Sequence, residues 1–223
     1  MFSKLFNPEN GLMITMSWIT DCLFLSLLWL FFSVFLIPLG PATAALYDTA
    51  VHTFRYKEEV VYRRFFRSFR KNLKTGIPAG IICLVTGWLG YTVWNRIAAL
   101  SGSSDMGYML LWGYFVILLL LLGIITFLFP LLSRFETGLA GLFKNGVLLC
   151  MIHLPKTVIL SLLSVVTIWL CLWLWWPIIF MPCLSALIAS VFIEPVFAPY
   201  MPEKEVPPEP EEEQDSHMKG EEL

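Results

Sequence analysis

A stretch of 37 residues between Lys156 and Glu194 contains no Asp, Glu, Lys, Arg or His. A helix in water needs a polar face, and this stretch offers none. About 20 apolar residues cross a bilayer, so the stretch is long enough for two short spans joined by a tight reversal. Pro177 and Pro182 lie near its middle, where a helix would break and turn. The sequence therefore predicts an integral membrane protein.

The composition supports this interpretation. The chain is 57% hydrophobic and 14% charged, whereas soluble domains carry roughly 25% charged residues. We expect an all-α, polytopic transmembrane helical bundle over residues 1–200, with no separate soluble domain. Its five predicted spans lie near residues 19–39, 77–94, 109–132, 157–175 and 178–193. Residues 201–223 are acidic and rich in proline, and such a segment is predicted to be disordered because it has too little apolar surface to fold.

The basic residues predict an orientation. Eight Lys and Arg fall between Arg55 and Lys74, in the first predicted loop. When the first and third loops and the C-terminus are placed inside, 13 Lys and Arg lie inside and two outside. The sequence therefore predicts a multi-pass protein of the cell membrane with its N-terminus outside and its C-terminus in the cytoplasm. Residues 41–45 contain an A-x-A pattern, but the apolar run before it is longer than that of a signal peptide, so we expect no cleavage.

The first loop also predicts an amphipathic helix over residues 60–74. On a helical wheel, one face of this segment is aromatic and apolar and the other is cationic. The first face carries Tyr62, Phe65, Phe66, Phe69 and Leu73, and the second carries Arg63, Arg64, Arg67, Arg70, Lys71 and Lys74. We expect the helix to lie in the cytoplasmic interface, with its rings among the acyl chains and its cations at anionic headgroups. A docking surface for a cytoplasmic partner is the alternative, and nucleic acid is not an expected partner because no fold presents the cations to it.

Asp21 is the acidic residue most deeply placed in a predicted span. A carboxylate in lipid is expensive, so it indicates a proton or cation relay, or a partner for Arg96. The alternative is that Asp21 lies within a turn of the outer interface and reaches water. A weak similarity between the segments that begin at Pro38 and at Pro130 would fit an internal repeat. Together these features leave open a small secondary transporter or channel that uses Asp21.

Catalytic and cofactor signatures are missing from the sequence. No P-loop, dinucleotide fingerprint, G-x-S-x-G or H-E-x-x-H is present. The five cysteines are scattered through apolar sequence without the spacing of metal ligands, and they are interpreted as small hydrophobic residues. We therefore expect no enzyme activity, no metal and no cofactor.

Several motifs resemble the YesL family of bacterial membrane proteins. The most specific is the string Gly40, Pro41, Ala42, Thr43, Ala44, Ala45, Leu46, Tyr47. Residues 65–72 (FFRSFRKN), 130–136 (PLLSRFE) and 194–197 (EPVF) also fit, so the resemblance extends over most of the chain from Phe6 to Tyr200. The chain departs from the family pattern at Glu136, at Gly146 and in its acidic tail.

The resemblance implies a function but no mechanism. Members of that family are small polytopic proteins of mostly Gram-positive bacteria with no established biochemical activity. They are often encoded beside carbohydrate-uptake ABC transporters. The resemblance therefore implies an accessory or regulatory role in carbohydrate uptake, with such a transporter or another membrane protein as the partner.

Overall fold

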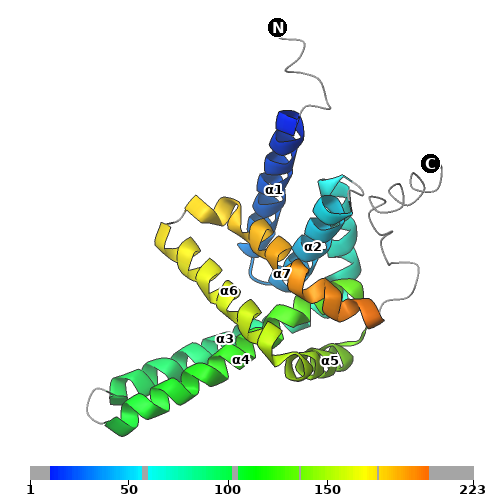
Figure 1. Cartoon of the computed structure of the whole chain (residues 1–223). Coiled ribbons are helices and arrows are strands. Elements are labelled where there is room, and N and C mark those ends of the chain that lie inside the picture. Colours follow the sequence, from blue (N-terminus) through cyan, green and yellow to red (C-terminus); the bar gives the residue numbers. More distant parts are fainter. Residues whose placement is uncertain (1–10, 57–59, 102–104, 136, 175, 201–223) are drawn as a thin grey trace, which may run out of the picture.

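The computed structural model describes residues 11–56, 60–101, 105–135, 137–174 and 176–200. The regular elements of these residues are all helical (Figure 1), which confirms the expected all-α fold. Five helices are long and apolar enough to cross a membrane. They are α1 (Gly11–Ser33), α3 (Val61–Ser101), α4 (Asp105–Arg134), α6 (Leu154–Leu174) and α7 (Met181–Phe197). The predicted tail at 201–223 lies outside the described residues.

Two shorter helices were not expected from the sequence. Helix α2 (Leu39–Ala50) follows α1 and continues into a π-helical turn, η2 (Val51–Arg55), while α5 (Leu139–Ile152) separates α4 from α6. Short 3-10 turns, η3 (Trp176–Ile179) and η4 (Ala198–Tyr200), flank α7. The segments after Pro38 and Pro130 thus each lead, through a short helix, into a long one, but the internal repeat stays a prediction.

The first predicted span extended six residues too far, because α1 ends at Ser33 rather than at residue 39. Leu36 has a φ of 56°, and this left-handed conformation does not continue a helix. Hydrophobicity alone did not reveal this turn, since residues 34–39 are almost entirely apolar. The chain therefore reverses here, and α2 packs back against α1.

Helix α2 is the central element of the bundle, because it contacts α1, α3, α4 and α7 and is buried over almost its whole length. Its closest approach is to α3, where Gly40 lies against Gly76 and Gly80. A Cβ atom on Gly40 would overlap the carbonyl oxygen of Gly76. Small residues four apart allow two helix backbones to come this close. Gly40 is therefore a packing residue inside a helix.

The basic segment does not form a separate helix. Instead α3 runs without interruption for 41 residues from Val61 to Ser101, a length of about 60 Å. Pro78 lies inside it, and it packs beside α4 along its second half in an arm that extends from the rest of the bundle (Figure 1). The expected amphipathic helix over 60–74 is therefore the first part of α3.

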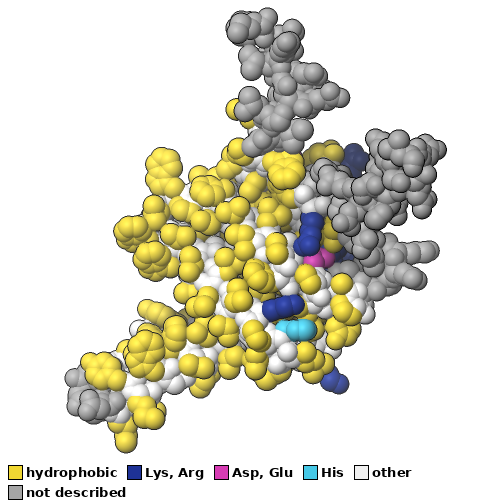
Figure 2. Space-filling view, viewed as in Figure 1, with side chains coloured by type: hydrophobic (Ala, Val, Ile, Leu, Met, Phe, Trp, Pro, Cys, Tyr) yellow, Lys and Arg dark blue, Asp and Glu magenta, His cyan; other side chains and the backbone are white. Residues whose placement is uncertain are grey.

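The outer surface carries many large apolar side chains (Figure 2). Trp169 and Trp173 stack with their ring centroids 5.6 Å apart near the turn between α6 and α7, and both are largely exposed. Soluble proteins rarely expose so much apolar surface, whereas a bilayer accommodates it and favours Trp at its interfaces. These exposed side chains fit helices that are surrounded by lipid.

Candidate functional site: a buried charge cluster

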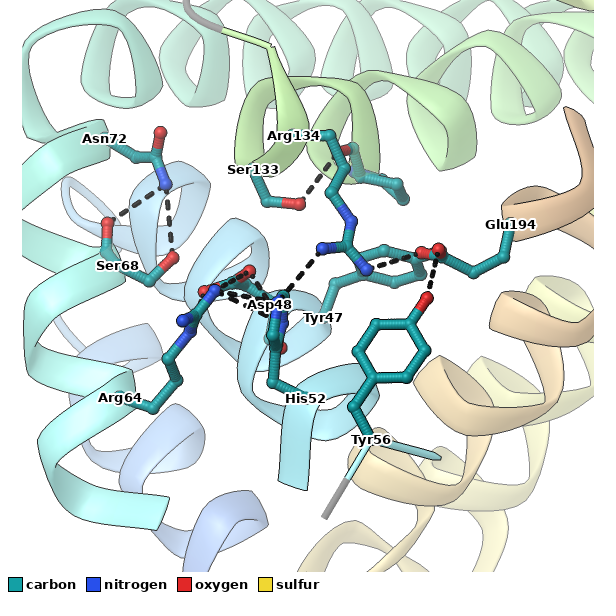
Figure 3. Close-up of polar contacts among 11 residues, drawn as sticks. Tyr47, Asp48, His52, Tyr56, Arg64, Ser68, Asn72, Ser133, Arg134 and Glu194 are labelled. Atoms are coloured by element: carbon teal, nitrogen blue, oxygen red, sulfur yellow. Dashed lines mark hydrogen bonds and ion pairs between the residues drawn. The ribbon is translucent and has the colours of Figure 1, made fainter. Parts of the chain in front are cut away.

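Four charged residues meet at one end of the bundle (Figure 3). Asp48 comes from the end of α2, Arg64 from the first turn of α3, Arg134 from the last residue of α4 and Glu194 from the end of α7. His52 in η2 lies between the two ion pairs that they form. We call these five residues, with Tyr47 and Tyr56, the charge cluster.

Arg134 and Glu194 form the more deeply buried ion pair. Arg134 Nη2 lies 2.8 Å from Glu194 Oε1, and the two side chains are only 5% and 7% exposed. The hydroxyl of Tyr47 donates to Oε1 and that of Tyr56 to Oε2, each at 3.0 Å. The guanidinium also lies over the ring of Tyr56, with its Cζ 5.9 Å from the ring centroid. Both oxygens of the carboxylate therefore have partners, as a buried charge requires.

Asp48 and Arg64 form the second ion pair. Nε and Nη2 of Arg64 donate to the two carboxylate oxygens of Asp48 at 2.9 and 3.1 Å, a bidentate geometry. Arg64 comes from the cationic face of the predicted amphipathic helix, but its side chain turns inward to α2. This ion pair therefore fixes the start of α3 to the end of α2.

His52 connects the two ion pairs. Its Nδ1 lies 2.9 Å from the carbonyl oxygen of Asp48, and its Nε2 lies 3.0 Å from Arg64 Nη2 and 3.2 Å from Arg134 Nη1. Nδ1 also lies 3.2 Å from Asp48 Oδ1 and 3.2 Å from Arg64 Nη2. The charge cluster is thus one continuous network across four elements: α2 with η2, α3, α4 and α7.

The ionisation of the cluster is set by its surroundings. Burial raises the pKa of Asp48, but hydrogen bonds from His52 and Arg64 outweigh it and hold that pKa well below its usual value. Burial, followed by the neighbouring charge of Glu194, raises the pKa of Tyr47 well above its usual value and also raises that of Tyr56. Asp48 therefore stays ionised and the two tyrosines stay protonated donors at neutral pH. This arrangement holds helices together through fixed, mutually compensated charges.

The exposed part of the basic segment forms a separate surface. Arg63, Arg67, Arg70, Lys71 and Lys74 are exposed, and with the exposed rings of Tyr62 and Phe66 they make up what we call the cationic face.

The aromatic residues of the same segment divide between two environments. Phe65 is fully buried and Phe69 nearly so, and both pack on Phe32 of α1 with ring centroids 5.9 and 4.7 Å away. The prediction that these two rings lie among acyl chains is therefore wrong, because they belong to the protein core. Only Phe66 and Tyr62 face outward. Packing of the buried rings on α1 fixes the segment to the bundle.

The string of residues 40–47 forms the buried part of α2 and contributes Tyr47 to the charge cluster. Thr43 accepts a hydrogen bond from Trp29 Nε1 at 3.2 Å and donates to the carbonyl oxygen of Leu39. Ala42, Ala44 and Ala45 are fully buried, so the A-x-A pattern lies within the bundle. The small residues of this string allow α2 to pack among four other helices.

Asp21 is not part of the charge cluster. It is half-buried on α1, next to Cys22, whose thiol lies 3.9 Å from the carbonyl oxygen of Phe180 at the start of α7. No ion pair joins Asp21 to Arg96 in the described part of the chain, so the structure does not support that predicted partnership.

A cavity of about 380 Å³ lies between α1, α2, α4, α6 and α7. Its walls are mainly apolar, and its hydroxyl groups include those of Thr126, Ser164 and Ser185. These hydroxyls donate to carbonyl oxygens of their own helices. Since its polar groups are paired within the protein, the cavity suits an apolar molecule better than a sugar.

Sequence reasoning treated the members of the charge cluster separately. It gave neither Arg134 nor Glu194 a partner on another helix. Asp48 stood in a predicted loop and was not considered. The signal was present, because isolated charges beside apolar segments need partners, and the predicted topology puts Asp48, Arg134 and Glu194 at the same membrane face.

The charge cluster contains one histidine and two carboxylates, but they do not converge on one point. Among the residues that the structure describes, no group of three or more His, Cys, Asp or Glu is placed to hold a metal ion.

The five apolar helices and their exposed surface define a multi-pass helical membrane protein. Residues 22–93 match a family model described as "Protein of unknown function, DUF624". This match covers most of α1, all of α2 and most of α3, and it includes Asp48, His52 and Arg64 but neither Arg134 nor Glu194. No curated protein and no solved structure matches the chain significantly.

Proposed function

We propose that this chain is a non-catalytic accessory or regulatory component of a membrane complex, and that it acts through the cationic face of α3. The observation that carries the proposal is how rigidly this face is presented. The Asp48–Arg64 ion pair and the buried rings of Phe65 and Phe69 fix the first turns of α3 on the bundle. A preorganised surface of this kind loses little conformational entropy when it binds a partner.

The chemistry of the cationic face supports an anionic counterpart. Exposed arginine and aromatic side chains are the types most enriched at protein interfaces, and clusters of Lys and Arg beside a membrane span attract anionic headgroups. The distribution of Lys and Arg over the whole sequence supports a cytoplasmic position for this face in the cell membrane. The face would therefore bind the acidic surface of a membrane partner while resting against anionic lipid.

The carbohydrate link rests on resemblance. The family model that matches residues 22–93 is consistent with the resemblance to YesL proteins, which are often encoded beside carbohydrate-uptake ABC transporters. This supports such a transporter as the partner. The apolar lining of the cavity argues that the sugar is carried by the partner and not by this chain.

The proposal is tested by affinity purification in mild detergent from the native host. One variant neutralises the exposed cations Arg63, Arg67, Arg70, Lys71 and Lys74 with glutamine. Arg64 is left unchanged, because its loss would disturb the fold. The control neutralises Arg96, Lys144 and Lys156 instead. We expect transporter subunits to copurify with the wild type and the control but not with the first variant; equal recovery with all three would refute the proposal.

Flux through the bundle is a second candidate function. It is favoured by the half-buried Asp21 on α1 and by the cavity between five helices. In liposomes, the wild type should then conduct protons or a small solute, and Asp21→Asn should lower the flux. Background flux from both proteins would exclude this function and leave the accessory role untouched.

A further inference from the structure

The outer side of α3 carries a shallow groove of about 500 Å³. It is lined by Tyr62, Arg63, Phe66, Arg67 and Arg70. Guanidinium groups and aromatic rings thus alternate along one side of a single helix. Such a groove fits an extended chain that offers carboxylates and flat apolar rings together, because carboxylates pair with arginine and proline rings pack on aromatic side chains.

The chain itself contains such a segment. After Tyr200 come 23 residues with nine acidic and two basic side chains. Three prolines, at positions 207, 208 and 210, lie among the six acids from Glu203 to Glu213. Proline-rich sequence favours the extended polyproline II conformation, in which little entropy remains to be lost on docking.

The end of α7 brings this segment close to the groove. Arg55 Nη1 donates to the carbonyl oxygen of Ser190 at 3.1 Å, and Tyr56 donates to Glu194 at 3.0 Å. The last turns of α7 are therefore held beside residues 55–56, a few positions before α3 begins at Val61. An extended chain of 23 residues reaches up to about 80 Å, whereas the basic part of α3 is only about 20 Å long. Tethering also makes the local concentration of the segment on the order of millimolar.

We propose that residues 203–213 dock in the groove on α3 of the same molecule. The carboxylates pair with Arg63 and Arg70, and the prolines pack on Tyr62 and Phe66. The segment occupies the surface that an anionic partner would use, so a partner must displace it. This inference goes beyond the proposed function, because it assigns an occupant from within the chain whether or not a partner exists.

The test is zero-length carbodiimide cross-linking of the full chain in nanodiscs of neutral lipid, followed by peptide mapping. Carbodiimide joins a carboxylate to a lysine amine only when the two are in contact. Lys71 and Lys74 follow Arg70 of the groove within one or two helical turns, whereas Lys144 is on α5 and Lys156 is on α6 and neither lines the groove. We expect Glu209–Glu213 to link to Lys71 or Lys74 and not to the control lysines, and we expect the yield to fall in 1 M salt, about seven times physiological ionic strength.

Variants separate docking from chance encounter. Arg63→Gln with Arg70→Gln keeps both reporter lysines and should lower the cross-link yield by roughly fivefold or more, whereas Lys144→Gln should not change it. A mixture of isotopically light and heavy protein should give cross-links within one molecule only. Cross-links spread evenly over all four lysines, insensitivity to the two arginines, or links between light and heavy chains would each overturn the proposal.

Discussion

The Arg134–Glu194 ion pair should be a major determinant of stability. Glu194→Gln keeps the shape of the side chain but removes its charge, which leaves the guanidinium of Arg134 buried at 5% exposure without a counter-charge. The hydroxyls of Tyr47 and Tyr56, which now donate to the two carboxylate oxygens, would face a neutral amide. Breaking one side of a buried ion pair costs about 3–5 kcal/mol. In a chain of this length that lowers the unfolding midpoint by roughly 6–20 °C.

The chain supplies its own probe for this measurement. Cys150 and Cys183 are buried, so a thiol-reactive fluorophore in detergent reports unfolding as these cysteines become accessible. Arg134→Gln should be as damaging as Glu194→Gln, and Lys144→Gln, an exposed change on α5, serves as the control. The double replacement of Arg134 by Met and Glu194 by Leu should lower the free energy of unfolding by less than the sum of the losses in the two single variants. The reason is that the double variant leaves no buried charge unpaired.

Two results would refute this reasoning. If Glu194→Gln shifted the midpoint no more than Lys144→Gln, the ion pair would not contribute to stability. If the effects of the single and double variants were additive, the two residues would not act on each other.

Three further predictions follow from the packing and charge of particular residues. Gly40→Leu should prevent recovery of folded protein in detergent, since even a Cβ atom at this position overlaps α3. Gly87→Ala should leave stability unchanged or raise it slightly, because the added Cβ meets nothing within 4 Å. Equal tolerance of both substitutions would contradict the close crossing of α2 and α3. Phe65→Ala should lower the free energy of unfolding by about 3–5 kcal/mol. It should lower the unfolding midpoint much more than Phe66→Ala, because of these two rings only that of Phe65 is fully buried. Similar shifts would place both rings in one environment. Because the pKa of Asp48 is lowered in the folded state, its contribution to stability should be complete at neutral pH and decrease as pH falls below about 4. Unfolding midpoints of wild type and Asp48→Asn should then converge in acid, and a constant difference would contradict the ion pair.

The hydrophobic pattern was sufficient to predict the membrane class and the number of long apolar helices. It could do so because lipid tolerates no unpaired backbone groups, so uncharged runs of 20 residues have few alternatives to a helix. The same pattern misplaced the end of α1, because hydrophobicity does not distinguish the apolar turn at residues 34–39 from a continued helix. It also missed α2, whose small residues carry little hydrophobic signal but fit a crowded position.

The amphipathic segment shows a second limit. The wheel separated rings from cations correctly, but a ring buried by protein and a ring buried by lipid look the same in sequence. Phe65 and Phe69 proved to pack on α1, and Arg64 proved to pair with Asp48. Long-range pairs such as Arg134 with Glu194 depend on how separate helices are arranged, and no local pattern encodes that arrangement.

The five-span arrangement determines which residues share a membrane face. In a variant without native cysteines, single cysteines at Arg70 and Lys144 would report one end of the bundle, and those at Met106 and Trp176 the other. A membrane-impermeant maleimide applied to intact cells should label the cysteines at Met106 and Trp176, and those at Arg70 and Lys144 only after the membrane is opened. Labelling of Arg70 and Trp176 positions from the same side would contradict the five-span arrangement.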